Sequence, residues 1–153
     1  MTELLQDHTT LRLGGPARTW VRATGEAELV EALADAEGPV LVLGGGSNLV
    51  VADAGFDGTV VEVATSGVRT DVEDDGPTCG GALVTVAAGE SWDDFVARAV
   101  EREWVGVEAL AGIPGRVGAT PIQNVGAYGQ EVAQTIASVR VCLLYTSPSP
   151  RDS

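Results

Sequence analysis

The chain has 153 residues, 44% of them hydrophobic, which is enough to build the core of one ordinary domain or of two small lobes. Its 22 acidic residues outnumber nine basic ones, all of them arginine, and the formal net charge is −13. Such a charge repels nucleic acid and anionic membranes, so any phosphate ligand must be held by local backbone donors and a few arginines. We therefore expect neither a nucleic-acid nor a membrane partner.

The cysteine pattern and the N-terminus predict a reduced, cytoplasmic protein. Cys79 and Cys142 lie far apart and form neither a CxxC pair nor a metal-ligand spacing with the single histidine. No base or cation adjoins Cys79 in sequence, so we expect an unreactive thiol at that position. No basic-then-apolar signal pattern opens the chain, and no apolar run reaches the roughly 18 residues that a membrane helix needs. No metal site is predicted.

The first part of the chain predicts an α/β lobe. Alternation of side chains indicates a strand, helical spacing of apolar residues indicates a helix, and a short apolar run indicates a buried strand. These elements predict a right-handed βαβ unit with parallel strands. We expect strands at 16–23, 40–43, 49–51 and 59–63, a helix at 26–37 and a turn at 53–58.

A glycine-rich loop, Gly44-Gly45-Gly46-Ser47-Asn48, directly follows the strand expected at 40–43. In open α/β sheets, ligands bind beyond the carboxyl ends of the strands, where such turns expose backbone donors. The pattern G-x-G-x-x-G is absent, which disfavours a Rossmann dinucleotide site. A tight turn between strands and a phosphate-contacting loop both remain open.

The second part of the chain predicts a hairpin followed by a helix. Ser91 and Asp94 fit a helix N-cap, and an apolar stripe that includes Trp92 and Phe95 follows at helical spacing. Core packing is the expected role of this stripe, with the lining of a cofactor pocket as the alternative. We expect hairpin strands at 68–73 and 82–88 around a polar loop at 74–81, a short helix at 131–136, and the start of a strand at 139–141.

The segment from residue 111 to residue 129, AGIPGRVGATPIQNVGAYG, holds five glycines and two prolines. Glycine and proline disfavour long regular elements, so the segment is expected to be a folded loop with free backbone donors. Such a loop is a good cradle for a large, flat, phosphate-bearing ligand. Its apolar underside is expected to consist of Ile113, Val117, Ile122 and Val125.

Three separated motifs resemble the UDP-N-acetylenolpyruvoylglucosamine reductase family. They are HTTLRLGGPA at 8–17, VLGGGSNLV at 42–50 and GIPGRVGATPIQNVGAYGQEV at 112–132, and the resemblance covers roughly residues 5–141. It implies an α+β fold, the vanillyl-alcohol-oxidase (PCMH) type of FAD-binding module with two α/β lobes. The expected division is a first lobe at 1–65, an incomplete second lobe at 66–141 and a non-native tail at 142–153, with a genuine disordered tail as the alternative.

The resemblance also implies the residues that bind FAD. In the first lobe they are Gly44, Gly45, Gly46, Ser47, Asn48 and Leu49. In the second lobe they are Gly112, Ile113, Pro114, Gly115, Gly118, Ala119, Ile122, Gln123, Asn124, Gly126, Ala127, Tyr128 and Gly129. Arg116 is expected to face solvent, with a phosphate contact as the alternative, and His8 is expected to be structural rather than an acid or base.

The activity implied by the resemblance is the NADPH-dependent reduction of UDP-N-acetylglucosamine enolpyruvate to UDP-N-acetylmuramate in peptidoglycan synthesis. The family's catalytic serine and glutamate, and its substrate-binding tyrosine and arginine, have no counterpart in this sequence. The chain is therefore expected to supply flavin contacts and no catalytic residue, and to be inactive alone. The alternatives are a non-catalytic FAD-binding module or truncated fragment, and an FAD-dependent oxidase of the same superfamily. The sequence predicts no oligomeric state.

Overall fold

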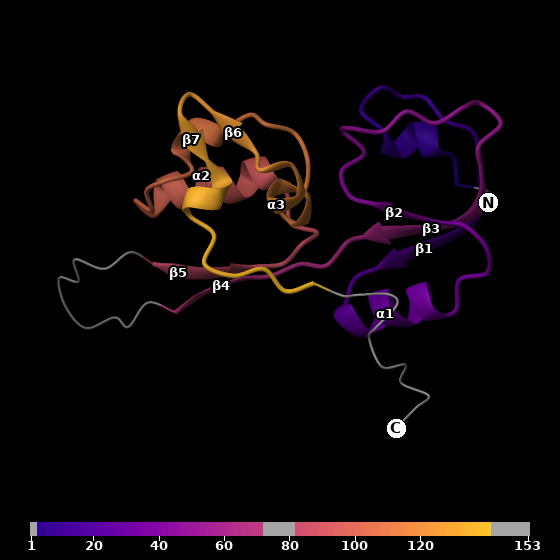
Figure 1. Cartoon of the computed structure of the whole chain (residues 1–153), viewed down its shortest axis with the longest axis horizontal. Helices are drawn as coiled ribbons and strands as arrows, with labels where there is room; N and C mark the ends of the chain where they lie inside the picture. Colours follow the sequence, from indigo (N-terminus) through magenta and orange to yellow (C-terminus); the bar gives the residue numbers. More distant parts are fainter. Residues whose placement is uncertain (1–2, 72–81, 142–153) are drawn as a thin grey trace. The chain divides into compact units, whose positions relative to one another are not determined.

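The computed structural model describes residues 3–71 and 82–141, and the chain divides into two compact units (Figure 1). Among the described residues, the first unit comprises 3–64 together with 138–141, and the second comprises 65–71 and 82–137. Each unit has its own hydrophobic core. The polar loop expected at 74–81, Cys79, Cys142 and the tail at 142–153 lie wholly or largely outside the described residues.

The first unit is built on a three-stranded parallel sheet of order β1-β3-β2. The strands predicted at 16–23, 40–43 and 59–63 and the helix predicted at 26–37 are confirmed, although the helix ends three residues early and β3 begins at Phe56. Gly38, with φ +80°, separates the helix from β2. The elements are β1 (Ala17–Ala23), α1 (Glu26–Ala34), β2 (Val40–Leu43) and β3 (Phe56–Val63).

The strand predicted at 49–51 is wrong, because those residues form no ladder in the described structure. Leu49 and Val51 do turn toward the core, which explains the strand-like pattern. Val50 between them is 70% exposed. The carbonyl of Ala52 accepts hydrogen bonds from Gly15 and Gly55 rather than from a strand, so the segment is an extended connection tied to the N-terminal residues.

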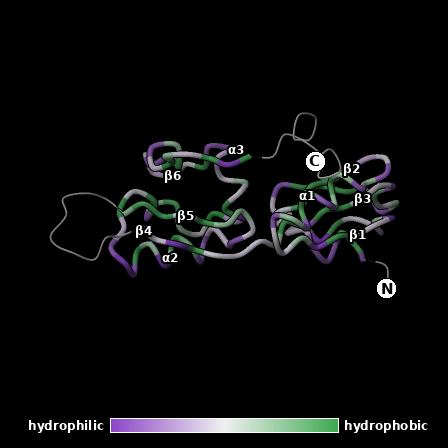
Figure 2. The backbone as a smooth tube through the Cα atoms, turned by 90° about the horizontal axis from the view of Figure 1, so that it is seen from below, coloured by the Kyte–Doolittle hydropathy of each residue, from purple (hydrophilic) through white to green (hydrophobic). Residues whose placement is uncertain are grey.

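The core of the first unit lies between the sheet and the N-terminal segment. The 3-10 helix η1 (Leu5–His8) places Leu5 against β2 and β3, and the backbone N–H of Leu5 donates to Gly15 at 3.0 Å. Strand β2 reads Val-Leu-Val-Leu and is hydrophobic throughout (Figure 2). The buried cluster comprises Leu5, Ala17, Leu43 and Val60.

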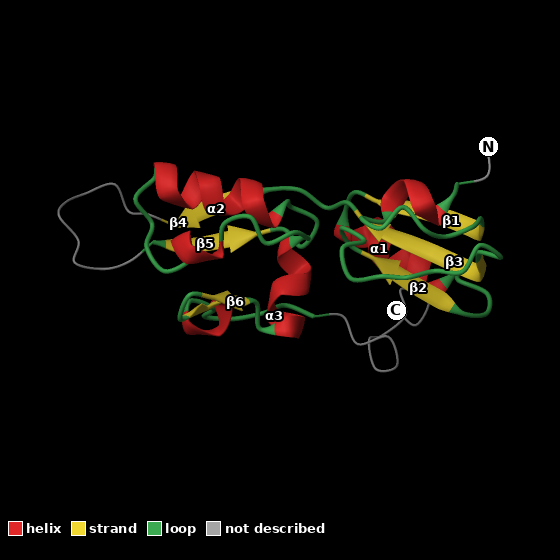
Figure 3. Ribbon diagram, turned by 90° about the horizontal axis from the view of Figure 1, so that it is seen from above, coloured by secondary structure: helices red, strands yellow, loops and turns green. Residues whose placement is uncertain are grey.

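The second unit contains the predicted hairpin and helix and a run of short elements after them (Figure 3). Asp94 N donates to the Ser91 hydroxyl at 3.3 Å, which confirms the predicted N-cap. The strand expected to start at 139–141 is wrong, since those described residues have no regular structure. The elements are β4 (Val68–Asp71), β5 (Leu83–Val86), α2 (Trp92–Glu101), η2 (Glu108–Leu110), η3 (Val117–Ala119), α3 (Thr120–Gln123), β6 (Gly126–Ala127), β7 (Gln130–Glu131) and η4 (Val132–Gln134).

Trp92 is the centre of the second core. Its ring is buried against Val96 and Leu110, and its indole N–H donates to the Leu110 carbonyl at 3.0 Å. The apolar stripe of α2 therefore packs the core, as predicted. None of the described helices has the length and hydrophobicity that crossing a membrane requires.

The fold makes Leu5 a test of the first core. Leu5 is 0% exposed, and Leu5→Ala is expected to lower the free energy of unfolding by about 3 kcal/mol, since the truncation removes buried apolar surface and leaves a cavity. Leu11 in the same N-terminal segment is 57% exposed, so Leu11→Ala should change stability by less than about 0.5 kcal/mol. Urea unfolding followed by circular dichroism measures both, and equal losses would contradict this account of the core.

Candidate functional site

The glycine loop of the first unit begins where β2 ends at Leu43. Gly46 is buried at φ +63°, and a Cβ at this position would lie 2.0 Å from the His8 carbonyl oxygen. The Gly46 carbonyl also accepts a hydrogen bond from Thr10 N at 3.1 Å. Only glycine fits such a backbone approach, so Gly46 fixes the loop against the N-terminal segment.

Some backbone donors of this loop make no hydrogen bond within the described structure. Gly45 and Asn48 are exposed, and the backbone N–H groups of Gly45, Gly46 and Asn48 donate to no residue that the structure describes. Exposed backbone donors after a parallel strand are a common means of binding an anion. The arrangement favours the phosphate-contacting loop over the simple turn that the sequence left open.

The N-terminal segment supports this loop, and the sequence analysis missed that role. Thr9 is buried and its hydroxyl donates to the Leu13 carbonyl at 2.9 Å. A Cβ at Gly15 would lie 2.0 Å from the Asp53 carbonyl oxygen. The adjacent Gly14-Gly15 pair was the available signal, because paired glycines in a connection mark a close backbone approach.

His8 has a structural role. Its ring lies against the Trp20 ring with centroids 4.3 Å apart, and its Nε2 is 3.2 Å from a Glu3 carboxylate oxygen. The side chain is thus used in packing the first unit, while its backbone carbonyl meets Gly46. These contacts agree with the expectation that His8 is structural.

The loop from 111 to 119 in the second unit is held in a similar way. Gly118 N donates to the Ala88 carbonyl at 2.8 Å, and a Cβ at Gly118 would lie 2.7 Å from the Ala88 side chain. Gly112 N donates to an Asp93 carboxylate oxygen at 2.6 Å. The N–H groups of Gly115 and Arg116 make no hydrogen bond to a described residue, so this loop also presents backbone donors.

The side chain of Arg116 is partly exposed and makes no ion pair within residues 3–71 and 82–141. Other arginines do find carboxylates: Arg18 pairs with Asp57 and Arg22 with Glu62. Solvent exposure and a phosphate contact therefore both remain open for Arg116.

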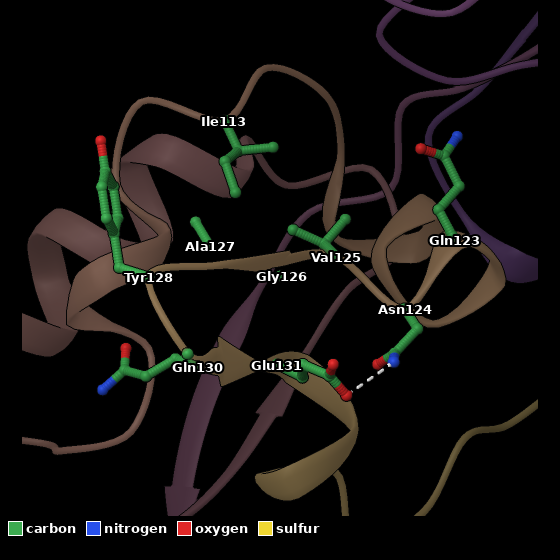
Figure 4. A pocket seen from close by; sticks show the side chains of 10 residues that line it. Ile113, Gln123, Asn124, Val125, Gly126, Ala127, Tyr128, Gln130 and Glu131 are labelled. Atoms are coloured by element: carbon green, nitrogen blue, oxygen red, sulfur yellow. Dashed lines mark hydrogen bonds between the residues drawn. The ribbon is translucent and has the colours of Figure 1, made fainter.

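A shallow pocket of about 600 Å³ lies over the later part of the loop (Figure 4). Of the predicted FAD-binding residues, the structure brings Ile113, Gln123, Asn124, Gly126, Ala127, Tyr128 and Gly129 together in its lining, and it adds Val125, Gln130 and Glu131. The sequence analysis omitted Gln130 and Glu131 because nothing in their residue types distinguishes them from solvent-facing side chains.

The predicted apolar underside is only partly correct. Ile113, Val117 and Val125 pack against the core around Trp92. Ile122 is 83% exposed, because α3 turns this side chain outward. The expectation that it belongs to the same apolar surface is wrong.

Asn124 has its side chain engaged within the loop. The residue ends α3 in the left-handed region, with φ 43°. Its Nδ2 donates to a Glu131 carboxylate oxygen at 3.0 Å, drawn as the dashed line in Figure 4, and its Oδ1 accepts from Ala133 N at 3.2 Å. The carboxamide therefore joins α3 to β7 and η4 and positions the pocket wall.

A second polar contact supports the same wall. The Gln130 side-chain oxygen accepts from Ala109 N at 2.8 Å. The Glu108 carboxylate accepts from Gly106 N at 2.6 Å. Hydrogen bonds from its own backbone N–H, from Gly106 and from the Gln130 side chain lower the pKa of Glu108.

Comparison with known proteins shows the family. A model described as "FAD binding domain" matches residues 17–145. The chain belongs to this FAD binding domain family. The UDP-N-acetylenolpyruvoylglucosamine reductase of Cutibacterium acnes is 62% identical over 135 residues, 86% of this chain and 35% of the relative. The corresponding reductase of Thermobifida fusca is 54% identical, over 90% of this chain and 38% of the relative.

The fold of the domain also has a solved counterpart. The crystal structure of the UDP-N-acetylenolpyruvylglucosamine reductase of Thermus caldophilus matches with a TM-score of 0.67 at 32% identity, covering 87% of this chain and 45% of that chain. The predicted resemblance and the α+β fold of the FAD-binding module are thereby confirmed. The chain spans about a third of the length of the curated relatives it matches.

Gly46 provides a test of the first loop. Gly46→Ala is expected to destabilise the chain by at least about 2 kcal/mol, because the new Cβ meets the His8 carbonyl and left-handed backbone is unfavourable for alanine. Gly25→Ala is the matched control, since nothing lies within 4 Å of its ideal Cβ and its φ is −135°. Urea unfolding compares the two, and a Gly46→Ala chain as stable as the control would show that the close approach does not exist.

Glu108 provides a pH-dependent test of the hydrogen bonds that support the pocket wall in the second unit. The pKa of this carboxylate is lower in the folded chain, so its stabilising contribution is present above its unfolded pKa of about 4.3 and is lost as pH falls through the folded value. Glu108→Gln should therefore reduce the urea midpoint more at pH 7 than at pH 3. Glu101→Gln, at the exposed end of α2, is the control. A deficit of Glu108→Gln that is the same at both pH values would contradict the assignment.

Proposed function

We propose that the chain binds FAD, and that each of its glycine loops offers backbone donors suited to a phosphate. The supporting observation is that the N–H groups of Gly45, Gly46, Gly115 and Arg116 lack acceptors among the described residues. In a chain of net charge −13, neutral donors of this kind can hold a pyrophosphate without a basic field. The FAD binding domain family supports the same cofactor.

We further propose that the chain is the FAD-binding part of a reductase acting on UDP-N-acetylglucosamine enolpyruvate, with NADPH as reductant and UDP-N-acetylmuramate as product. The support is the identity of 62% and 54% to proteins named UDP-N-acetylenolpyruvoylglucosamine reductase. FAD supplies hydride transfer when bound. The partners in this proposal are small molecules, and a cytoplasmic location follows from the proposed use of NADPH and a nucleotide sugar.

The chain's own residues have binding and positioning roles in this proposal. The loop of Gly44 to Leu49 and the loop of Gly112 to Ala119 offer backbone donors. Residues 122–129 carry the later part of the predicted FAD-binding set, with Asn124 fixing the pocket wall. No residue of the chain is assigned the proton transfer to substrate.

The purified 153-residue chain tests this proposal directly. It should take up FAD and show visible flavin absorbance after removal of free cofactor, and equilibrium dialysis should give a saturable dissociation constant. Incubated with NADPH and the enolpyruvyl substrate, it should show no turnover above free FAD.

Two outcomes would contradict the proposal separately. A folded chain that stays colourless and takes up no FAD would exclude cofactor binding. Turnover at the rate of a complete reductase would show that the catalytic residues are present after all.

A further inference from the structure

The first unit contains a second pocket, of about 370 Å³, on the face of the sheet that carries α1. Helix α1 lies beside the edge strand β1 (Figure 1), and the pocket is lined by residues of both. Trp20 and Val60 pack with the core around Leu5, so their neighbours along β1 and β3 face the opposite way and form the pocket floor. These floor residues are Thr19, Val21 and Thr59. We call this space the α1 pocket.

Thr59 gives the α1 pocket a buried hydroxyl that has no partner within the described structure. The residue is only 6% exposed, and its hydroxyl makes no hydrogen bond to a described residue. The other buried threonines of the described chain, Thr9 and Thr120, each donate to a backbone carbonyl. A buried hydroxyl without a partner costs free energy, so most are hydrogen-bonded. No side-chain oxygen of the described residues is both sealed from solvent and unpaired, so the Thr59 hydroxyl is open to the pocket.

The helix side of the α1 pocket is acidic. Glu31 is exposed, and its carboxylate makes no hydrogen bond or ion pair with a described residue. The one base in the lining, Arg22, has its Nε 3.7 Å from a carboxylate oxygen of Glu62. The lining therefore attracts a cation rather than an anion. Its carboxylates are those of Glu28, Glu31 and Asp35.

The end of α1 adds to this preference for positive charge. The last turn of the helix holds no basic residue, and the residue that caps it is Asp35. The C-terminal end of a helix carries a partial negative charge, which is normally offset by a cation. Since both Asp35 and Ala36 line the pocket, a positively charged ligand there would supply what the sequence of α1 lacks.

The shape of the pocket distinguishes an organic cation from a metal ion. No group of three or more His, Cys, Asp or Glu side chains in residues 3–71 and 82–141 is arranged to hold a metal. A volume of about 370 Å³ is also far larger than one ion needs and falls in the range of small-molecule sites. Val21 and Ala32 add apolar surface to the same lining. A short alkyl chain with a positive charge at each end matches this distribution.

We propose that the α1 pocket binds an alkyldiammonium ligand. One ammonium group donates to the Thr59 hydroxyl, the other pairs with the carboxylates of Glu31 and Asp35, and the alkyl chain contacts Val21 and Ala32. The pocket shares no residue with either glycine loop. The proposal therefore does not depend on the binding of FAD.

Isothermal titration calorimetry of the full chain with 1,4-diaminobutane tests this proposal. At an ionic strength of about 0.15 M, where long-range attraction to the acidic surface is screened, the heat should saturate at one ligand per chain. The neutral analogue 1,4-butanediol, of the same length, should give no saturable heat. The Kd for the diamine should be the same with and without FAD in the cell.

Two variants locate the ligand in the α1 pocket. Thr59→Val keeps the size of the side chain and removes the hydroxyl, so the Kd for 1,4-diaminobutane should rise about tenfold. Its melting temperature should be no lower than that of the original chain, because the lost hydroxyl has no partner in the described structure. Glu31→Gln should raise the Kd about threefold. Glu37→Gln is the matched control, since Glu37 is exposed and lies outside the lining, and its Kd should be unchanged.

Each contrary result would overturn a particular part of the inference. Absence of saturable heat, or equal binding of the diol, would exclude an ammonium site. Equal binding by Thr59→Val would place the ligand elsewhere, and a lower melting temperature of this variant would show that the hydroxyl is used within the fold. Equal weakening by Glu31→Gln and Glu37→Gln would reduce the effect to general attraction by the acidic chain. A chain that binds the diamine but no FAD would refute the proposed function alone.

Discussion

Two close backbone approaches determine the form of both candidate loops. At Gly46 a side chain would collide with the His8 carbonyl, and at Gly118 it would collide with Ala88. Each glycine brings a loop against a neighbouring segment. The N–H groups of Gly45 and Asn48 in the first loop, and of Gly115 and Arg116 in the second, make no hydrogen bond to a described residue. A backbone anchored at one point can present donors in a fixed direction, which is what an anion site requires.

Because the chain is strongly acidic, backbone N–H donors are especially important for binding an anion. With 22 acidic residues and nine arginines, the long-range field of the chain repels a pyrophosphate. Local attraction must therefore come from donors that are not already paired with a carboxylate. Arg18 and Arg22 are already paired with carboxylates. Backbone N–H groups are neutral donors that are not used in these ion pairs, so they are the groups best suited to bind a pyrophosphate.

The positioning of the second loop depends on side chains as well as glycines. Asp93 holds the start of the loop, and Asn124 joins its later part to Glu131 and Ala133. These contacts turn a glycine-rich segment into short, ordered elements. They also tie the hairpin of β6 and β7 at its base.

Local patterns predicted the regular elements of the fold well. The strand at 40–43 and the cap at Ser91 depend on residues close in sequence, so propensity and spacing were sufficient for both. The strand expected at 49–51 failed because an apolar alternation cannot reveal whether a partner strand exists. Ile122 failed for a related reason, since the direction of a side chain on the one-turn helix α3 depends on tertiary contacts.

The glycine loops of the candidate site could be predicted from the sequence, but the residues that hold these loops in place could not. The glycine loops stood out by composition, and the family resemblance indicated the same residues. The roles of Thr9, Gly15 and Gln130 depend on contacts with residues far along the chain, which no local pattern records. The hydrogen bonds of the Asn124 carboxamide to Glu131 and Ala133 likewise could not be read from its neighbours in sequence.

The most direct test of the central claim is a titration of the ¹⁵N-labelled chain with FAD, followed by amide NMR. If backbone donors hold the pyrophosphate, the amide protons of Gly45, Gly46 and Gly115 should move downfield together and saturate at the same FAD concentration. ADP, which carries the pyrophosphate without the flavin, should shift the same amides. Binding of FAD that leaves these three amides unmoved would contradict the account.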